Sequence, residues 1–118
     1  LLHHIRLRLN PLENYELTDR WNQGKLNFSD IVEWVKCQPE ADNFTTDELT
    51  HLAKCMFDIY AWHMRNKPIG HFATALVQNN FLNSCNRADS INKRALILYA
   101  HFLTWIAPQD YQDKAKTL

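Results

Sequence analysis

Residues 89–108 read DSINKRALILYAHFLTWIAP, and their apolar side chains recur at helical spacing. These side chains fall into two adjoining rows that cover most of the circumference of a helix. A helix of this kind is normally buried rather than laid on a surface. We therefore expect one buried helix that begins at the capping residue Asp89 and ends at Pro108, unless it is shared with a second subunit. The rows are Ile91, Ala95, Leu98, Phe102 and Trp105, and Leu96, Tyr99, Leu103 and Ile106.

The composition of the whole chain favours a single, mainly helical domain. Its 118 residues are enough to bury one core, and 46% hydrophobic and 12% aromatic residues are typical of an ordered globular protein. Two glycines and four prolines leave little material for turns. We expect an all-α fold over residues 11–108, a compact bundle of about five helices around a buried C-terminal helix.

Helix-end signals place the other helices. The first three are expected at about 12–21, 30–37 and 46–66, and a shorter fourth helix begins near Phe72. The sequence TTDE at 45–48 is a capping box, in which a threonine oxygen and a glutamate carboxylate each bind a free backbone amide. The third helix has an amphipathic pattern, and its apolar face consists of Leu49, Leu52, Ala53, Met56, Ile59, Tyr60 and His63.

The two ends of the chain differ from its helical middle. Residues 1–10 alternate loosely between apolar and polar side chains, which predicts an extended N-terminal arm that packs on the domain or pairs with its copy in a dimer. His3 and His4 could bind a metal there, although a surface or tag-derived origin explains them better. Residues 109–118 form a polar tail that we expect to fray.

The charges cancel over the whole chain but not within each half. Lys and Arg total 13 and Asp and Glu total 13, which does not favour a strongly basic nucleic-acid binder. Residues 11–58 have a balance of 4 − 10 = −6, and residues 59–118 have a balance of 7 − 3 = +4. Either the halves attract each other or solvate separate faces, or an acidic face is presented to a basic partner.

The cysteines and the hydropathy pattern bear on the compartment. Cys37, Cys55 and Cys85 are odd in number and widely spaced, which favours free thiols in a reducing, cytoplasmic environment. No apolar run reaches the roughly 18 residues that a membrane-spanning helix needs, and the start of the chain has no secretory pattern. Because the chain begins without methionine, the sequence could be a fragment or a processed form.

Residues 70–108 contain a recognisable succession of short motifs. They read GHFATALVQNNF at 70–81, RAD at 87–89 and Asn92, followed by the apolar helix up to the last proline. This stretch resembles a family of small uncharacterised proteins encoded by bacteriophages and prophages. The sequence departs from the family at 80–81, where Asp-Leu is usual, and lacks a Trp-Gly-Ser after the proline. The resemblance implies a phage or mobile-element origin and a compact helical fold, and it supplies no catalytic residues.

The run from Arg87 to Asp89 has both a structural and a functional interpretation. In the structural one, Asp89 caps the last helix and Arg87 binds the end of the preceding helix or the Asp89 carboxylate. In the functional one, Arg87, Asn92 and the free amides at the helix start form an anion-binding site. The structural interpretation is sufficient to explain the motif.

Arg94 and His101 lie two turns apart on the expected last helix. Their spacing loosely resembles the Arg-x(4–6)-His signature of helical ribonucleases of the HEPN class. In those enzymes the arginine stabilises phosphate charge and the histidine moves a proton. A basic solvated face with Lys93 and Arg94, beside a half-buried His101, explains the pattern better.

A zinc site is the other chemistry that the spacing allows. His51 and Cys55 lie four positions apart on the third helix and could bind zinc together with Cys85 or His63. No paired Cys-x-x-C or His-Glu-x-x-His motif accompanies them, and Cys55 fits as a small buried apolar residue. We therefore predict no metal and no cofactor.

These observations predict a non-enzymatic protein that binds a host protein and modulates its activity, for example as an inhibitor of a defence system. Two alternatives stay open: a nucleic-acid-binding protein that uses the basic C-terminal half, and a HEPN-like ribonuclease. A homodimer is also predicted, from the apolar last helix and the N-terminal arm. Most aromatic side chains should be core, and any that are exposed on adjacent turns would mark an interface.

Overall fold

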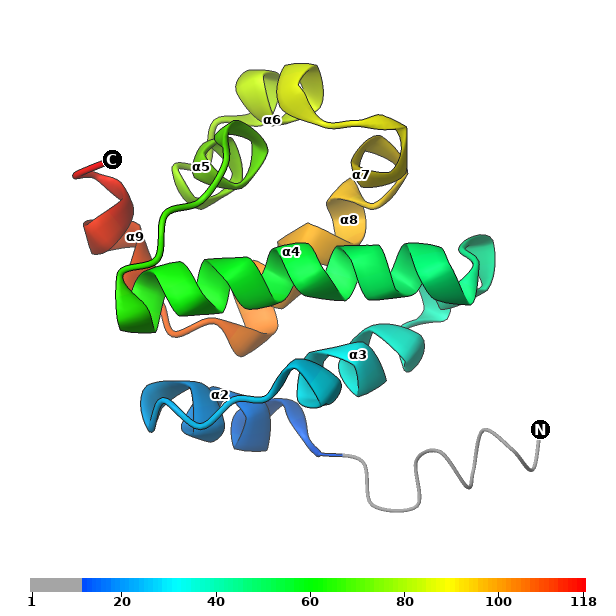
Figure 1. The fold of residues 1–118 in the computed structure, drawn as a ribbon, viewed down its shortest axis with the longest axis horizontal. Helices are drawn as coiled ribbons and strands as arrows, with labels where there is room; N and C mark the ends of the chain where they lie inside the picture. Colours follow the sequence, from blue (N-terminus) through cyan, green and yellow to red (C-terminus); the bar gives the residue numbers. More distant parts are fainter. Residues whose placement is uncertain (1–11) are drawn as a thin grey trace.

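The computed structural model describes residues 12–118, and within that range every regular element is a helix. The all-α class is thus confirmed for the described part of the chain. The expected arm, residues 1–10, lies outside it. The longest helix, α4 (Thr46–Arg65), crosses the middle of the molecule (Figure 1). In this view α2 (Asn14–Asn22) and α3 (Phe28–Lys36) lie below it, and α5 (His71–Val77) and α6 (Phe81–Arg87) lie above it.

The expected positions of the first four helices are confirmed to within two residues. Their starts are fixed by side chains close in sequence. The backbone amide of Glu13 donates to the Glu16 carboxylate at 2.9 Å before α2, and the amide of Asn27 donates to Asp30 at 3.0 Å before α3. Such reciprocal caps satisfy amides that have no partner within a helix.

The α4 helix begins at the predicted capping box. The Thr45 hydroxyl accepts from the Glu48 amide at 3.1 Å, and the Glu48 carboxylate accepts from the Thr45 amide at 2.9 Å. The helix ends at Asn66, which adopts a left-handed conformation with φ of 58°. Elements pack on both sides of α4, so its buried residues extend beyond the predicted stripe: Leu49, Leu52, Ala53, Met56, Ile59, Tyr60, Ala61 and Trp62.

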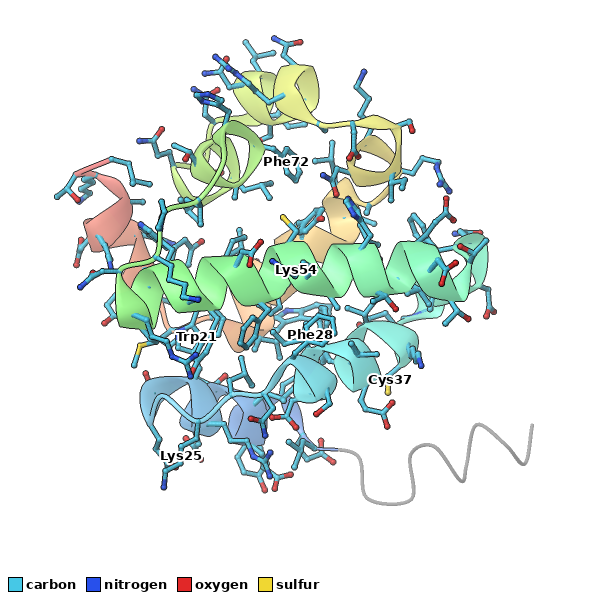
Figure 2. All side chains as sticks on the ribbon, viewed as in Figure 1. Trp21, Lys25, Phe28, Cys37, Lys54 and Phe72 are labelled. Atoms are coloured by element: carbon cyan, nitrogen blue, oxygen red, sulfur yellow. The ribbon has the colours of Figure 1, made fainter. Side chains whose placement is uncertain are left out.

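Aromatic side chains join α2, α3 and α4 to the C-terminal half. Trp21 is fully buried, and its ring lies 5.4 Å from that of Tyr60 and 5.6 Å from that of Phe102. Trp34 also packs on Phe102, at 5.8 Å. Figure 2 shows Trp21 and Phe28 between α4 and the two N-terminal helices. The core therefore has an aromatic centre to which both halves of the chain contribute.

The last apolar stretch is not one helix, which corrects our expectation for residues 89–108. It consists of α7 (Ser90–Arg94), α8 (Leu96–His101) and a π-helix, η2 (Phe102–Ile106). The chain turns at Ala95, which is completely buried. In η2 the Ala107 amide binds the Phe102 carbonyl, so that the wider turn brings Phe102 and Ile106 into the core.

The expected polar tail folds rather than frays. Residues 111–115 form α9 (Tyr111–Ala115), in which Tyr111 and Ala115 are buried. Those two side chains are four positions apart, so they form one apolar stripe on a single helical turn. Gln78 at the end of α5 donates to the Ala115 carbonyl at 3.3 Å. With this element, the described residues contain eight α-helices, more and shorter than the five or so expected.

Within residues 12–118, no helix combines the length and the apolar character needed to cross a membrane.

Candidate interaction surface

The predicted site residues at the start of the last apolar stretch act mainly as structural caps. Asp89 accepts a hydrogen bond from the Asn92 amide at 2.7 Å and lies 3.5 Å from the His51 ring nitrogen. The Asn92 side chain is buried and accepts from the Tyr99 hydroxyl at 2.5 Å. Arg87 is exposed at the end of α6. Because Asn92 points into the core, these residues do not converge on a common anion.

Arg94 holds α7 against the start of α4. Its guanidinium lies 2.5 Å from the Glu48 carboxylate, donates to the Asn43 carbonyl at 3.3 Å and covers the Phe44 ring at 4.9 Å. The pKa of Glu48 is lowered by its bond from the Thr45 amide and by Arg94. A guanidinium engaged on three sides is a structural clamp rather than a free phosphate-binding group.

His101 has different neighbours from Arg94. Its ring stacks on Trp105 at 4.1 Å, and its buried Nδ1 has no hydrogen-bond partner among the described residues. Lys93, on the exposed side of α7, makes no contact that joins the two. The contacts of Arg94 and His101 therefore do not bring them together as a HEPN-like reaction would require.

The residues considered for zinc are also separated by their contacts. His51 pairs with Asp89, and burial raises the pKa of the Cys55 thiol to about 11, as expected for a small buried apolar residue. Within the described range, no three His, Cys, Asp or Glu side chains gather in a group that could hold a metal ion.

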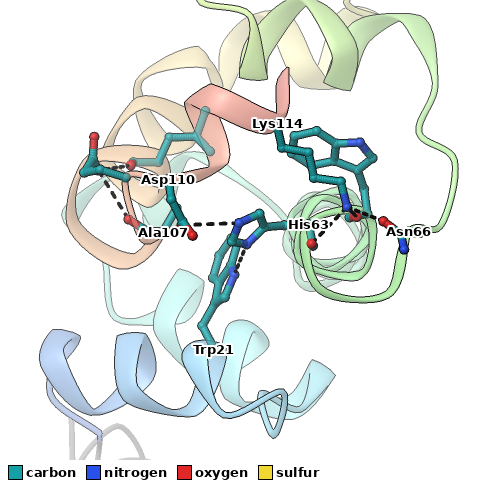
Figure 3. A network of polar contacts seen from close by, with 9 residues as sticks. Trp21, His63, Asn66, Ala107, Asp110 and Lys114 are labelled. Carbon is teal, nitrogen blue, oxygen red and sulfur yellow. Dashed lines mark hydrogen bonds and ion pairs between the residues drawn. The ribbon is translucent and has the colours of Figure 1, made fainter. Parts of the chain in front are cut away.

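A polar network that sequence analysis missed joins three distant segments (Figure 3). The Trp21 indole donates to His63 Nδ1 at 2.8 Å, and His63 Nε2 lies 3.3 Å from the Asp110 carboxylate. Since Nδ1 accepts, the neutral ring carries its proton on Nε2, the nitrogen that faces the Asp110 carboxylate. His63 was expected on the apolar face of α4, and neither partner is near it in sequence.

This network predicts that stability falls in mild acid. Burial, the largest cause, and then Lys114 lower the pKa of His63 below its ordinary value near 6.5, against the opposing effect of Asp110. At pH values between the folded-state and the unfolded-state pKa of His63, the unfolded chain therefore binds more protons than the folded one. Stability is therefore full above about pH 6.5 and decreases as the pH falls toward the lower, folded-state pKa.

Urea unfolding midpoints measured between pH 5 and 8 check this prediction. A His63→Gln variant keeps an acceptor for the Trp21 indole but does not titrate, so its midpoint should decrease less on acidification than that of the wild type. His51→Gln is the matched control, because His51 is half exposed, and it should keep the wild-type pH dependence. Equal pH dependence of His63→Gln and the wild type would contradict the assignment.

An apolar groove lies between α6 and α8, and we call it the α6–α8 groove. Its cavity volume is about 380 Å³, and α5, α6, α8 and η2 supply its walls. The apolar part of the lining consists of Leu76, Phe81, Leu96, Ile97, Ala100 and Leu103.

Polar side chains border the groove, and a second hollow of about 720 Å³ continues it toward α9. The second hollow has a mixed lining in which amide side chains and Lys116 accompany apolar residues, and neither lining contains a carboxylate. The two hollows share Asn79, Leu103, Thr104 and Tyr111.

Large apolar side chains are exposed on the helices that form this groove. Phe81 and Leu82 at the start of α6 are 70% and 72% exposed, and Ile97 and Trp105 are each 50% exposed. Ile97 and Phe81 also line the cavity. Trp105 was expected in a buried row, and its exposure corrects that expectation. Clusters of exposed apolar side chains on a folded protein mark interaction sites, whereas scattered ones need no explanation.

Three of the seven basic residues of the C-terminal half bind other parts of the fold, and Lys67 and Lys116 are exposed on separate segments. Arg94 binds Glu48, Arg65 covers the Tyr60 ring at 5.3 Å, and Lys114 binds carbonyls at the end of α4. The exposed bases Arg87 and Lys93 lie on α6 and α7. This arrangement gives little support to a continuous basic stripe for nucleic acid.

Comparison of the chain with protein-family models, with curated proteins and with solved structures gives no significant match.

Proposed function

We propose that this chain is a non-enzymatic interaction protein that binds another protein through the α6–α8 groove. The observation that carries the proposal is the group of protruding apolar side chains from α6, α8 and η2 around an apolar cavity. Covering such surface stabilises a complex by about 25 cal/mol per Å² of apolar area. Exposed Phe and Trp side chains are also the types that dominate binding energy at protein interfaces.

The chemistry of the groove supports binding rather than catalysis. The ionisable side chains in the two linings are Lys116 and Tyr111, and burial raises the pKa of Tyr111. Neither lining holds a histidine, a cysteine or a carboxylate, the usual groups for proton transfer or nucleophilic attack. A binding role requires only the shape and apolarity that the groove has.

The resemblance of residues 70–108 to phage and prophage proteins is the ground for proposing that the partner is a host protein. That stretch contains all of the groove lining except Tyr111. Modulation of a host defence protein in the cytoplasm is one form of this role and stays a prediction. Binding through the groove does not depend on the origin of the chain.

Replacing Phe81 by Glu should weaken partner capture at least about tenfold, because a buried interface aromatic commonly contributes more than about 1.4 kcal/mol. The measurement is affinity capture from a nuclease-treated bacterial lysate, with quantitative mass spectrometry of the bound proteins. Phe81 is 70% exposed, so the fold should be unaffected. Tyr15→Glu is the matched control, since Tyr15 is a similarly exposed aromatic on α2 and should leave capture unchanged.

Capture of the same partners in the same amounts by the wild type and by Phe81→Glu would contradict a role for the groove. Recovery of nucleic acid before nuclease treatment, with a steep loss at higher salt, would instead favour the basic residues as the binding surface.

A further inference from the structure

The groove extends over more surface than a small molecule would cover. Phe81 and Ile97 line the cavity, but Leu82 and Trp105 protrude outside it and would stay in water if a small ligand filled it. The adjoining second hollow continues the depression along η2 and α9. An elongated depression bordered by helices, with an apolar part and a polar part, is the shape that accepts an amphipathic helix. The described residues contain no strand, so they offer no sheet edge to an extended peptide.

The charged residues around the groove indicate which charge a binding partner should carry. Between Asp58 and Asp110 the sequence has one acidic residue, Asp89, and its carboxylate already caps α7 and pairs with His51. Lys116 lines one end of the depression, and Arg87 ends the helix that carries Phe81. At the Lys116 end, Asp113 lies 3.5 Å from Lys116 in an exposed and therefore weak ion pair. A partner with carboxylates beside its apolar face would meet Arg87 at one end and would compete with Asp113 for Lys116 at the other.

A second copy of this chain fits these charges less well. Docking groove against groove would bring two halves of net charge +4 together. The acidic half, residues 11–58, has the right sign, but Tyr15 is its one large apolar side chain in the described range that is exposed. A single exposed aromatic cannot fill an elongated depression. The favoured occupant is therefore a different protein.

From these observations we infer that the α6–α8 groove binds an amphipathic helix of a partner protein whose apolar face is flanked by acidic residues. This inference rests on the proposed function and specifies the chemistry of the partner. The apolar face contacts Phe81, Ile97 and Trp105, and the acidic flanks approach Arg87 and Lys116. The neutral amides of the second hollow offer hydrogen bonds to polar groups between them.

The test uses the full chain and two synthetic helical peptides of about 18 residues that differ only in charge. Both have leucines at i, i+3, i+4 and i+7, and one carries glutamate on the flanks where the other carries lysine. Binding is measured by fluorescence anisotropy at low salt. The glutamate peptide should bind at least about tenfold more tightly than the lysine peptide, and more weakly as salt increases.

Two variants check that the groove is the binding site. Ala100→Trp fills the groove from α8 and should reduce affinity for the glutamate peptide at least about tenfold. Thr50→Trp, on the exposed side of α4, is the matched control and should have no effect. Lys116→Glu should reduce the preference for the glutamate peptide without changing the fold, because Lys116 is exposed.

Equal affinity for both peptides, preference for the lysine peptide, or no binding of either would overturn the inference. So would a dimer in sedimentation of the chain alone that Ala100→Trp dissociates, because the occupant would then be a second copy. If neither peptide binds while Phe81→Glu still prevents capture of a cellular protein, the acidic helix is wrong and the proposed function stands. If neither peptide binds and Phe81→Glu also leaves capture unchanged, the acidic-helix inference and the proposed function are both wrong.

Discussion

Replacing Trp21 by alanine is expected to destabilise the protein by about 3–5 kcal/mol, the usual cost of truncating a large buried aromatic. Trp21 is fully buried and contacts Tyr60 and Phe102, so it joins α2 to α4 and η2. Its indole also donates to His63, which would lose its hydrogen bond at Nδ1. The change therefore combines a cavity with a buried acceptor that has no donor.

Urea unfolding measured by circular dichroism tests this prediction. Tyr15→Ala is the matched control on the same helix, because Tyr15 is 68% exposed, and it should change stability by less than about 0.5 kcal/mol. Trp21→Phe keeps most of the packing and removes the indole donor, so it should cost about 1–3 kcal/mol. Similar midpoints for Trp21→Ala and Tyr15→Ala would show that α2 does not contribute to the core as described.

Lys114→Met should destabilise the protein by about 1.5–3 kcal/mol, the range for hydrogen bonds to a charged group. The Lys114 ammonium donates to the Trp62 carbonyl and to Asn66 Oδ1 at 2.6 Å, and to the His63 carbonyl at 3.0 Å. The two carbonyls belong to the last turn of α4, and the Trp62 carbonyl also accepts from the Asn66 amide that caps the helix. A cation there also interacts favourably with the negative end of the helix dipole.

Lys116→Met provides the control for Lys114→Met, since Lys116 is exposed and its one ion pair, with Asp113, is 3.5 Å long. Its effect should be below about 0.5 kcal/mol. Hydrogen exchange should also show that the amides at the end of α4 exchange faster in Lys114→Met than in Lys116→Met. Identical exchange in the two variants would mean that Lys114 does not secure the end of α4.

The parts of the fold that could be predicted are those determined within a few residues. The Thr45–Glu48 capping box needs only a hydroxyl and a carboxylate three positions apart, and the start of α4 was predicted from it. Spacing also identified most of the buried face of α4, but not the burial of Ala61 and Trp62, which lie outside the predicted stripe.

The break at Ala95 could not be predicted, because no glycine or proline marks it. It depends on tertiary contacts that fix both sides of the turn, namely Arg94 with Glu48 and the buried Asn92 with Tyr99. Tyr111 and Ala115 form a stripe of a single turn, which is too short to stand out from a polar sequence. Local patterns identified the apolar residues but not the points where the chain changes direction.

The candidate groove was missed for a related reason. Ile97 lies in the last apolar stretch, and Trp105 was placed in one of its buried rows, yet each is half exposed because no described element covers that side of α8 and η2. Periodicity shows which residues are apolar, whereas exposure depends on which neighbouring helices are present. Exposed aromatics were predicted to mark an interface, and the structure was needed to identify Trp105 and Phe81 as the exposed ones.

The bonds from Lys114 to the end of α4 also bear on how the chain folds during synthesis. They join positions 51 and 52 residues apart, so the ribosome must add about that many residues after α4 before the contact can form. A nascent chain that stops after α8 contains the whole sequence of α4 but lacks the ammonium that binds the Trp62 and His63 carbonyls. Until α9 is synthesised, the end of α4 is incompletely stabilised and is open to binding by chaperones or cleavage by proteases.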